Sequence, residues 1–234
     1  MAAGGIDPEI GKLISLAQSE SAESRSQLYL SIAHLMESRA GGFSPSEREL
    51  LNAIMRQLTR QVEMQVRQAL AERMSELDDA PHDLILLLAN DHIEVAQGVL
   101  EKSTLLNEDE LIDIINVATH LHQKAIAGRG DVTERVAASL AESSAPEVLL
   151  ELVRNQRARI ASDTMERLAE RSRDNVELQR GVLSRPELQQ DLATRMCGFV
   201  SDALHGFITQ RFGIDPVTIR KDLALASAEA PARM

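Results

Sequence analysis

Apolar residues recur along most of this chain at the spacings of three and four that are typical of amphipathic α-helices. The clearest pattern starts at Ser44-Pro45-Ser46-Glu47, which combines an N-cap residue, a proline in the first turn and a glutamate three residues after the cap. Neither Gly nor Pro follows until residue 81. The sequence therefore predicts one long helix over about 45–77, whose apolar stripe consists of Leu51, Ile54, Leu58, Val62, Val66, Leu70 and Met74.

This stripe needs a partner, and two are compatible with the pattern. Residues 8–39 contain two weaker helical patterns, so the long helix can pack against them in an N-terminal helical bundle spanning 1–78. The same stripe could instead meet its counterpart in a second copy of the chain and form a homodimer.

Beyond residue 78, possible helix starts recur in which an Asp, Asn or Ser stands three residues before a Glu. The Asp pairs are separated by 40 to 43 residues, and each is followed by a second start; the pairs are Asp91/Glu94, Asp131/Glu134, Asp174/Glu177, Asn107/Glu110, Ser144/Glu147 and Ser184/Glu187. A period near 40 with several helices per repeat is typical of HEAT and armadillo solenoids. We therefore predict an all-α fold in which a HEAT/armadillo-like solenoid over 79–226 follows the N-terminal bundle.

The predicted repeats lie near 90–130, 131–173 and 174–213, and a C-terminal helix follows them. The third is atypical, because its Pro186 helix is predicted to continue to about Gly213. Aligned apolar positions are predicted to form the core, namely Val95, Val136 and Leu178, then Val99, Leu140 and Val182, then Leu111, Leu152 and Leu192. Residues 1–5 and the tail 227–234 lack apolar periodicity and are predicted to be disordered.

Composition restricts the partners and the compartment. A formal net charge of −11 disfavours a nucleic-acid backbone or an acidic membrane as the main partner. The single cysteine cannot form an internal disulfide, the N-terminus lacks the pattern of a signal peptide, and no apolar run is long enough to span a bilayer. We expect a cytoplasmic protein.

No group of residues in the sequence predicts catalytic, cofactor or metal chemistry. His120 and His122 are two residues apart and would point to different sides of a helix, so they could not chelate one ion together. Cys197 and His205 would lie more than two helical turns apart, and the paired carboxylates are explained as helix caps. We therefore expect a protein that is not an enzyme.

The charge distribution is the feature that most suggests function. Thirteen acidic and three basic residues lie between Glu63 and Asp113, whereas eight arginines and five acidic residues lie between Arg154 and Arg185, so the two regions have opposite signs. One interpretation is an ordinary solvated surface with local ion pairs. The other is a patch that binds an acidic partner, because guanidinium groups hold carboxylates or phosphates by paired hydrogen bonds; its residues would be Arg154, Arg157, Arg159, Arg167, Arg171 and Arg173.

The chain also resembles a largely alphaproteobacterial family, a domain of unknown function whose members carry HEAT-like helical repeats. The resemblance spans about 45–213 and rests on Ala69-Leu70-Ala71-Glu72-Arg73, Asp79-Ala80-Pro81, Leu88-Ala89-Asn90-Asp91, Val95-Ala96, Val99-Leu100, Leu105 and Asp109-Glu110-Leu111-Ile112. It implies the fold, a bacterial cytoplasmic setting and a regulatory or scaffolding role, and it brings no catalytic residues.

Together these observations favour a non-enzymatic protein–protein interaction scaffold or adaptor with a protein partner, for which an acidic partner would suit the arginine patch. A HEAT-like module that uses the arginine-rich stretch 154–185 to bind nucleic acid, a nucleotide or a second messenger is the alternative. The acidic total weighs against nucleic acid.

Overall fold

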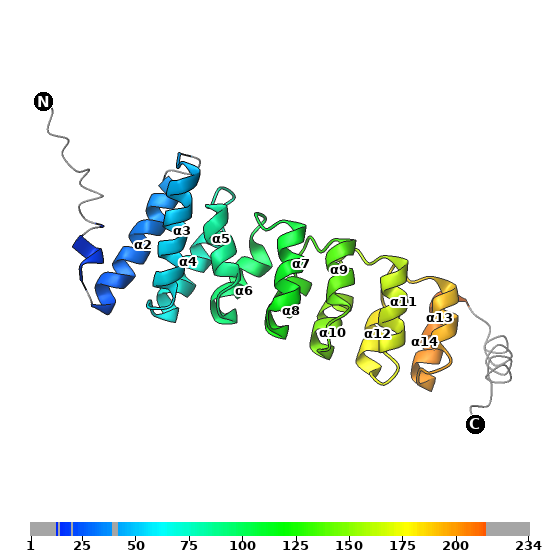
Figure 1. Ribbon diagram of the computed structural model, residues 1–234. Coiled ribbons are helices and arrows are strands. Elements are labelled where there is room, and N and C mark those ends of the chain that lie inside the picture. The colour runs from blue at the N-terminus through cyan, green and yellow to red at the C-terminus, as the bar shows by residue number, and fades with distance from the viewer. Residues whose placement is uncertain (1–12, 14, 20, 39–41, 214–234) are drawn as a thin grey trace, which may run out of the picture. The chain divides into compact units, whose positions relative to one another are not determined.

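The computed structural model describes residues 13, 15–19, 21–38 and 42–213, and these residues form helices joined by short loops, without a β-strand (Figure 1). The all-α prediction is confirmed. The chain divides into two compact units, residues 1–125 and 126–234. The predicted boundary at residue 78 lies inside the first unit, and the predicted disordered segments 1–5 and 227–234 lie outside the described residues.

The first unit contains helices from α2 to the start of α8. In this unit α3 packs on α2 and α5, and α4 packs on α5 and α6. The bounds are Ala22–Ser38 for α2, Pro45–Thr59 for α3, Met64–Ser75 for α4, His82–Ala89 for α5, Ile93–Lys102 for α6, Glu108–Val117 for α7 and His120–Ala127 for α8.

The second unit consists of helix pairs in two layers. Helices α11 and α13 are neighbours in one layer, α10 and α12 are neighbours in the other, and the layers meet within each pair (Figure 1). The bounds are Glu134–Leu140 for α9, Pro146–Arg154 for α10, Ser162–Arg171 for α11, Val176–Leu183 for α12, Gln190–Met196 for α13 and Asp202–Phe212 for α14.

The spacing of these pairs differs from the predicted repeat. The first helices of three successive pairs begin at Glu134, Ser162 and Gln190, which are 28 residues apart each time. The prediction of units 40 to 43 residues long is therefore wrong, because each predicted unit combines helices from neighbouring pairs. The nine aligned core positions are nevertheless all buried, as predicted.

The predicted long helix over 45–77 is also wrong. Helix α3 ends at Thr59 and α4 begins at Met64, although no Gly or Pro separates them. The side chain of Val62 turns into the core, and its carbonyl accepts a hydrogen bond from Arg67 at 2.6 Å. Tertiary packing thus interrupts a continuous helical pattern. Residues of the predicted stripe are buried within the first unit, including Leu58, Leu70 and Met74, so these positions contribute to internal packing. The homodimer stays a prediction.

The predicted helix from Pro186 to Gly213 is likewise divided into α13 and α14. Helix α13 ends at Cys197, and the chain turns through Gly198. Ser201 has an extended backbone and is the N-cap residue of α14. Gly213 ends α14 in the left-handed region, with φ of 64°, which glycine adopts without a steric penalty.

Two predicted N-caps are present as complete capping boxes, at Ser44/Glu47 and at Asn107/Glu110. The other five predicted caps are wrong. Helices α9 and α12 use Thr133 and Asn175 instead of the neighbouring Asp131 and Asp174. Ser144 precedes Ala145, the N-cap residue of α10, and Ser184 lies at the end of α12.

Asp91 has a different task from the predicted cap. Its carboxylate accepts two hydrogen bonds from the Arg67 guanidinium, at 2.7 and 2.9 Å, and both side chains are largely enclosed. Its backbone carbonyl accepts from His122 Nε2 at 2.9 Å, and Thr119 donates its hydroxyl hydrogen to His122 Nδ1 at 2.8 Å. This network ties α4, the α5–α6 turn and α8 together within the first unit.

Three arginines of the second unit, which we call the carbonyl-bound arginines, connect each helix pair to the preceding one. Arg171 donates to the carbonyls of Ala141 and Ser143, Arg185 donates to those of Asn155 and Ala158, and Arg211 donates to those of Leu183 and Arg185. Each reaches back 26 to 30 residues. They donate to carbonyls in loops and at helix ends, where backbone acceptors are commonly left without intrahelical donors. The carbonyls of Asn155 and Arg185 also accept from the amides of Ala158 and Leu188.

Candidate protein-binding groove

The six arginines of the predicted patch have different roles in the structure. Arg171 is one of the carbonyl-bound arginines, so its guanidinium is already committed to Ala141 and Ser143. Arg154 forms an ion pair with Glu177 at 3.3 Å. Arg167 lies 3.5 Å from Glu142 and donates to the Thr164 hydroxyl at 3.0 Å.

Arg157 and Arg159 differ from the rest. Both are exposed on the loop between α10 and α11, and neither has a carboxylate within ion-pair distance among the described residues. Backbone bonds fix the loop, from the Arg157 amide to Asn155 Oδ1 and from the Arg159 amide to the Val132 carbonyl. These two remain available cations of the predicted patch.

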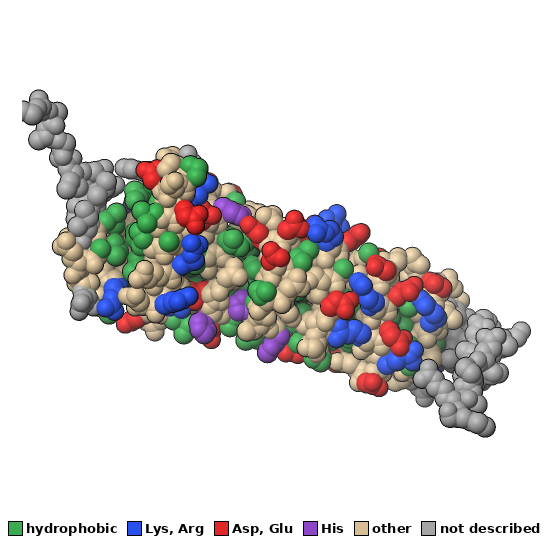
Figure 2. Space-filling view, in the orientation of Figure 1, with side chains coloured by type: hydrophobic (Ala, Val, Ile, Leu, Met, Phe, Trp, Pro, Cys, Tyr) green, Lys and Arg blue, Asp and Glu red, His purple; other side chains and the backbone are tan. Residues whose placement is uncertain are grey.

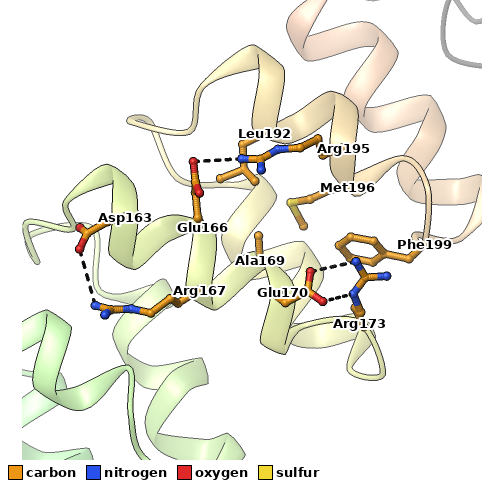
Figure 3. A pocket seen from close by; sticks show the side chains of 10 residues that line it. All are labelled: Asp163, Glu166, Arg167, Ala169, Glu170, Arg173, Leu192, Arg195, Met196 and Phe199. Atoms are coloured by element: carbon orange, nitrogen blue, oxygen red, sulfur yellow. Dashed lines mark hydrogen bonds and ion pairs between the residues drawn. The ribbon is translucent and has the colours of Figure 1, made fainter. Parts of the chain in front are cut away.

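A groove lies between α11 and α13 (Figure 3). We call it the α11–α13 groove. It has a volume of about 530 Å³, and its residues are Asp163, Glu166, Arg167, Ala169, Glu170, Arg173, Leu192, Arg195, Met196 and Phe199. Arg167 and Arg173 are the members of the predicted patch that line it.

The floor of the α11–α13 groove is apolar and well packed. Ala169, Leu192 and Met196 are buried core residues, and Phe199 is half-buried beside them. Amphipathic helices explain this arrangement, since α11 and α13 turn these residues toward the interior and their charged residues toward solvent.

The rim carries both signs of charge in paired positions. Glu166 meets Arg195 across the two helices at 3.0 Å, Arg173 binds Glu170 through both ends of its guanidinium, and Arg167 lies 4.0 Å from Asp163. The hydrogen bonds from Arg173 hold the pKa of Glu170 below its ordinary value, and the pKa of Arg173 is raised in return. Acidic and basic side chains intermingle in the same way over α9 to α14 in Figure 2.

Arg173 also connects the rim to the floor. Its guanidinium carbon lies 4.7 Å from the centroid of the Phe199 ring, within the range of a cation–π contact. The aromatic ring is thereby held at the end of the groove, between the charged rim and the apolar floor (Figure 3).

Comparison with known proteins identifies the family of this segment. Residues 95–233 match the family described as "Uncharacterised protein conserved in bacteria (DUF2336)". The chain belongs to the DUF2336 family. No curated protein and no solved structure gave a significant match. The DUF2336 segment includes the whole α11–α13 groove and the six predicted arginines.

Sequence reasoning assigned only Arg167 and Arg173 to a site and missed the other groove residues of this DUF2336 protein, among them Glu166, Arg195, Met196 and Phe199. Glu166 and Arg195 are 29 positions apart, close to the 28-residue interval between α11 and α13. The signal that could have paired them is therefore the shorter repeat, which the 40-residue alignment obscured.

Other candidate chemistry in this DUF2336 protein has structural explanations. His122 is buried in the Asp91 network, and Cys197 is buried in the core, where burial raises the pKa of its thiol. Within the described part of the chain, no group of three or more His, Cys, Asp or Glu residues could hold a metal ion. In the same residues, no helix is both long and apolar enough to cross a bilayer.

Proposed function

We propose that this protein is a non-enzymatic scaffold or adaptor, built from HEAT-like helix pairs, that binds another protein through the α11–α13 groove. The observation that carries the proposal is the groove itself, an apolar floor with a half-buried aromatic ring between two rows of charged side chains. Protein interfaces commonly combine such an apolar centre with a polar, exchangeable rim.

The paired rim suits a partner with charges of both signs. Each rim ion pair is solvent-exposed and therefore contributes little to folding, so an incoming side chain can replace one member at small cost. A bacterial setting agrees with the family description, and we add to the proposal a cytoplasmic location and a regulatory role.

Affinity purification of the tagged full chain from lysate of the source bacterium, with nuclease treatment and mass spectrometry, tests the proposal. The decisive variant is the charge swap Glu166→Arg/Arg195→Glu, which keeps an ion pair at the groove but reverses its direction. We expect the swap and Phe199→Ala to lose a protein partner that the wild type retains. Circular dichroism should show unchanged helix content in both variants.

The matched control is Arg157→Glu/Arg159→Glu, which reverses two charges outside the groove residues. We expect this variant to retain the partner. Loss of the partner in this control alone would move the site to the α10–α11 loop and favour the acidic partner expected from sequence. Recovery of nucleic acid or a nucleotide instead of a protein, or a turnover activity, would refute the proposed function.

A further inference from the structure

A second groove lies wholly within the first unit, where three turns between helices meet. It has a volume of about 840 Å³ and is lined by the end of α3, the α5–α6 turn and the α7–α8 turn. We call it the turn groove. The residues that characterise it are Arg56, Arg60, His92, Glu94, Val117 and Leu121.

The turn groove exposes two large apolar side chains, which lie together in one concave surface. Val117 at the end of α7 is 79% exposed, and Leu121 in the first turn of α8 is 45% exposed. Both line the groove, only four positions apart in the chain. Exposed apolar side chains that share a concave surface with polar residues are typical of an interaction site rather than of scattered surface residues.

The same groove has an excess of positive charge. Arg56 and Arg60, at the end of α3, are exposed and have no carboxylate within ion-pair distance among the described residues. Two acidic residues line the groove, and one of them, Asp91, is already neutralised by the paired bonds from Arg67. Glu94 alone therefore opposes two arginines.

This sign is unusual for its surroundings. The stretch from Glu63 to Asp113 contains thirteen acidic residues and three basic ones, and the chain as a whole has a net charge of −11. A local positive surface attracts an acidic segment of a partner, whereas the acidic surface around it repels such a segment from other positions. Helix α6 also begins at this groove without a side-chain cap, which adds a favourable dipole for a carboxylate.

We propose that the turn groove binds an acidic peptide segment of a partner protein, with an apolar side chain on Val117 and Leu121 and carboxylates facing Arg56 and Arg60. The two arginines supply charge complementarity and the exposed pair supplies apolar contact, and both requirements select the same class of sequence. The proposal goes beyond the scaffold function assigned to the α11–α13 groove, since it concerns a different unit and different residues.

Selection from a phage-displayed library of random dodecapeptides on the immobilised full chain tests the inference. We expect enriched peptides to carry several Asp or Glu residues around a Leu, Ile or Phe. Fluorescence anisotropy with the most enriched peptide should show affinity at least tenfold lower for Arg56→Glu/Arg60→Glu, and also lower for Val117→Ser/Leu121→Ser. All four positions are exposed, so the variants should fold, which circular dichroism checks.

The controls separate this proposal from the previous one. The variants Arg157→Glu/Arg159→Glu and Glu166→Arg/Arg195→Glu should bind the peptide as the wild type does. A library that enriches no acidic peptide overturns the inference, and so does an enriched peptide whose affinity is unchanged in Arg56→Glu/Arg60→Glu. Neither result affects the α11–α13 groove, whose own test uses the charge swap there.

Discussion

Arg67 in α4 and Asp91 in the α5–α6 turn form an enclosed ion pair of the first unit, with side chains 10% and 5% exposed. Removing one member leaves a buried charge without its partner, so Arg67→Met should lower the free energy of unfolding by about 3–5 kcal/mol. Urea unfolding followed by tyrosine fluorescence measures this effect in the first unit, because the single tyrosine, Tyr29, is fully buried there.

Arg73→Met is the matched control for that measurement. Arg73 also lies in α4 and pairs with Glu37, but its side chain is 55% exposed, so its loss should cost less than about 1 kcal/mol. Equal effects for the two arginines would show that the Arg67–Asp91 pair has no special structural importance.

The sequence alone could not show whether Asp91 caps a helix or pairs with an arginine. An aspartate three residues before a glutamate is an adequate cap signal, yet here the carboxylate is taken by an arginine 24 residues earlier in the chain. Asp131 likewise pairs with the nearby Arg129. A buried arginine competes successfully for a carboxylate because its charge needs a partner once water is excluded, and this competition is visible only in the folded structure.

Cys197 should be chemically inert in the native protein. Its side chain is 2% exposed, burial raises the pKa of its thiol, and its sulfur donates to the Ala193 carbonyl. Because the thiolate is the reactive form, we expect the native protein to react with a disulfide reagent at pH 8 far more slowly than the urea-unfolded protein. Equal rates in the two states would contradict the packing of α13.

At the scale of helices, two glycines provide an opposed pair of tests. A methyl group at Gly181 in α12 would lie 2.3 Å from Val153 Cγ2 in α10, whereas at Gly206 in α14 it would meet nothing within 4 Å. Gly181→Ala should therefore destabilise by about 1–3 kcal/mol through overpacking, and Gly206→Ala should stabilise by about 0.5–1 kcal/mol. Thermal unfolding by circular dichroism compares both with the wild type.

The same sign of effect in both alanine variants would show that helix propensity, not the close approach of α10 and α12, governs these positions. The contact between α10 and α12 would then be looser than the structure shows.

Helix boundaries were predictable where local chemistry sets them. The capping boxes at Ser44 and Asn107 both lie where the sequence predicts them. The break between α3 and α4 was not predictable, because no Gly or Pro marks it and Val62 enters the core there for reasons of packing. Local signals thus locate helix starts better than they locate interruptions.

At the scale of the whole molecule, the pairing of helices was harder to derive than the helices themselves. All nine aligned core positions are buried. The alignment nevertheless matched Val136 with Leu178, although α9 is the first helix of its pair and α12 is the second. Since every helix buries an apolar stripe, several registers of alignment match equally well. The α11–α13 groove depends on the correct register, and for that reason only Arg167 and Arg173 were found from the sequence.

Among the carbonyl-bound arginines, Arg185 is the one whose substitution should destabilise the fold most. It is 1% exposed and also contacts Glu187. Replacement by Met removes the side-chain donor to the Ala158 carbonyl and one of the two donors to the Asn155 carbonyl, and it leaves Glu187 without its partner. We expect the free energy of unfolding to fall by about 3–5 kcal/mol. Amide hydrogen exchange read from peptides within 126–213 should show the effect in the second unit.

Arg180→Met is the appropriate comparison, because Arg180 is exposed and its ion pair with Glu177 spans 3.9 Å. In the Arg180→Met variant, the protection of backbone amides from exchange should remain close to that of the wild type. Similar loss of protection in both variants would show that general helix destabilisation, rather than the lost carbonyl bonds, explains the result for Arg185.

The direction of the bonds from the carbonyl-bound arginines has a consequence for biosynthesis. Every backbone acceptor precedes its arginine in the chain, by 26 to 30 residues. The acceptor carbonyls of each helix pair are therefore synthesised before the arginine that donates to them. The second unit can thus assemble progressively from its N-terminal side during translation, with each pair secured before the next one emerges.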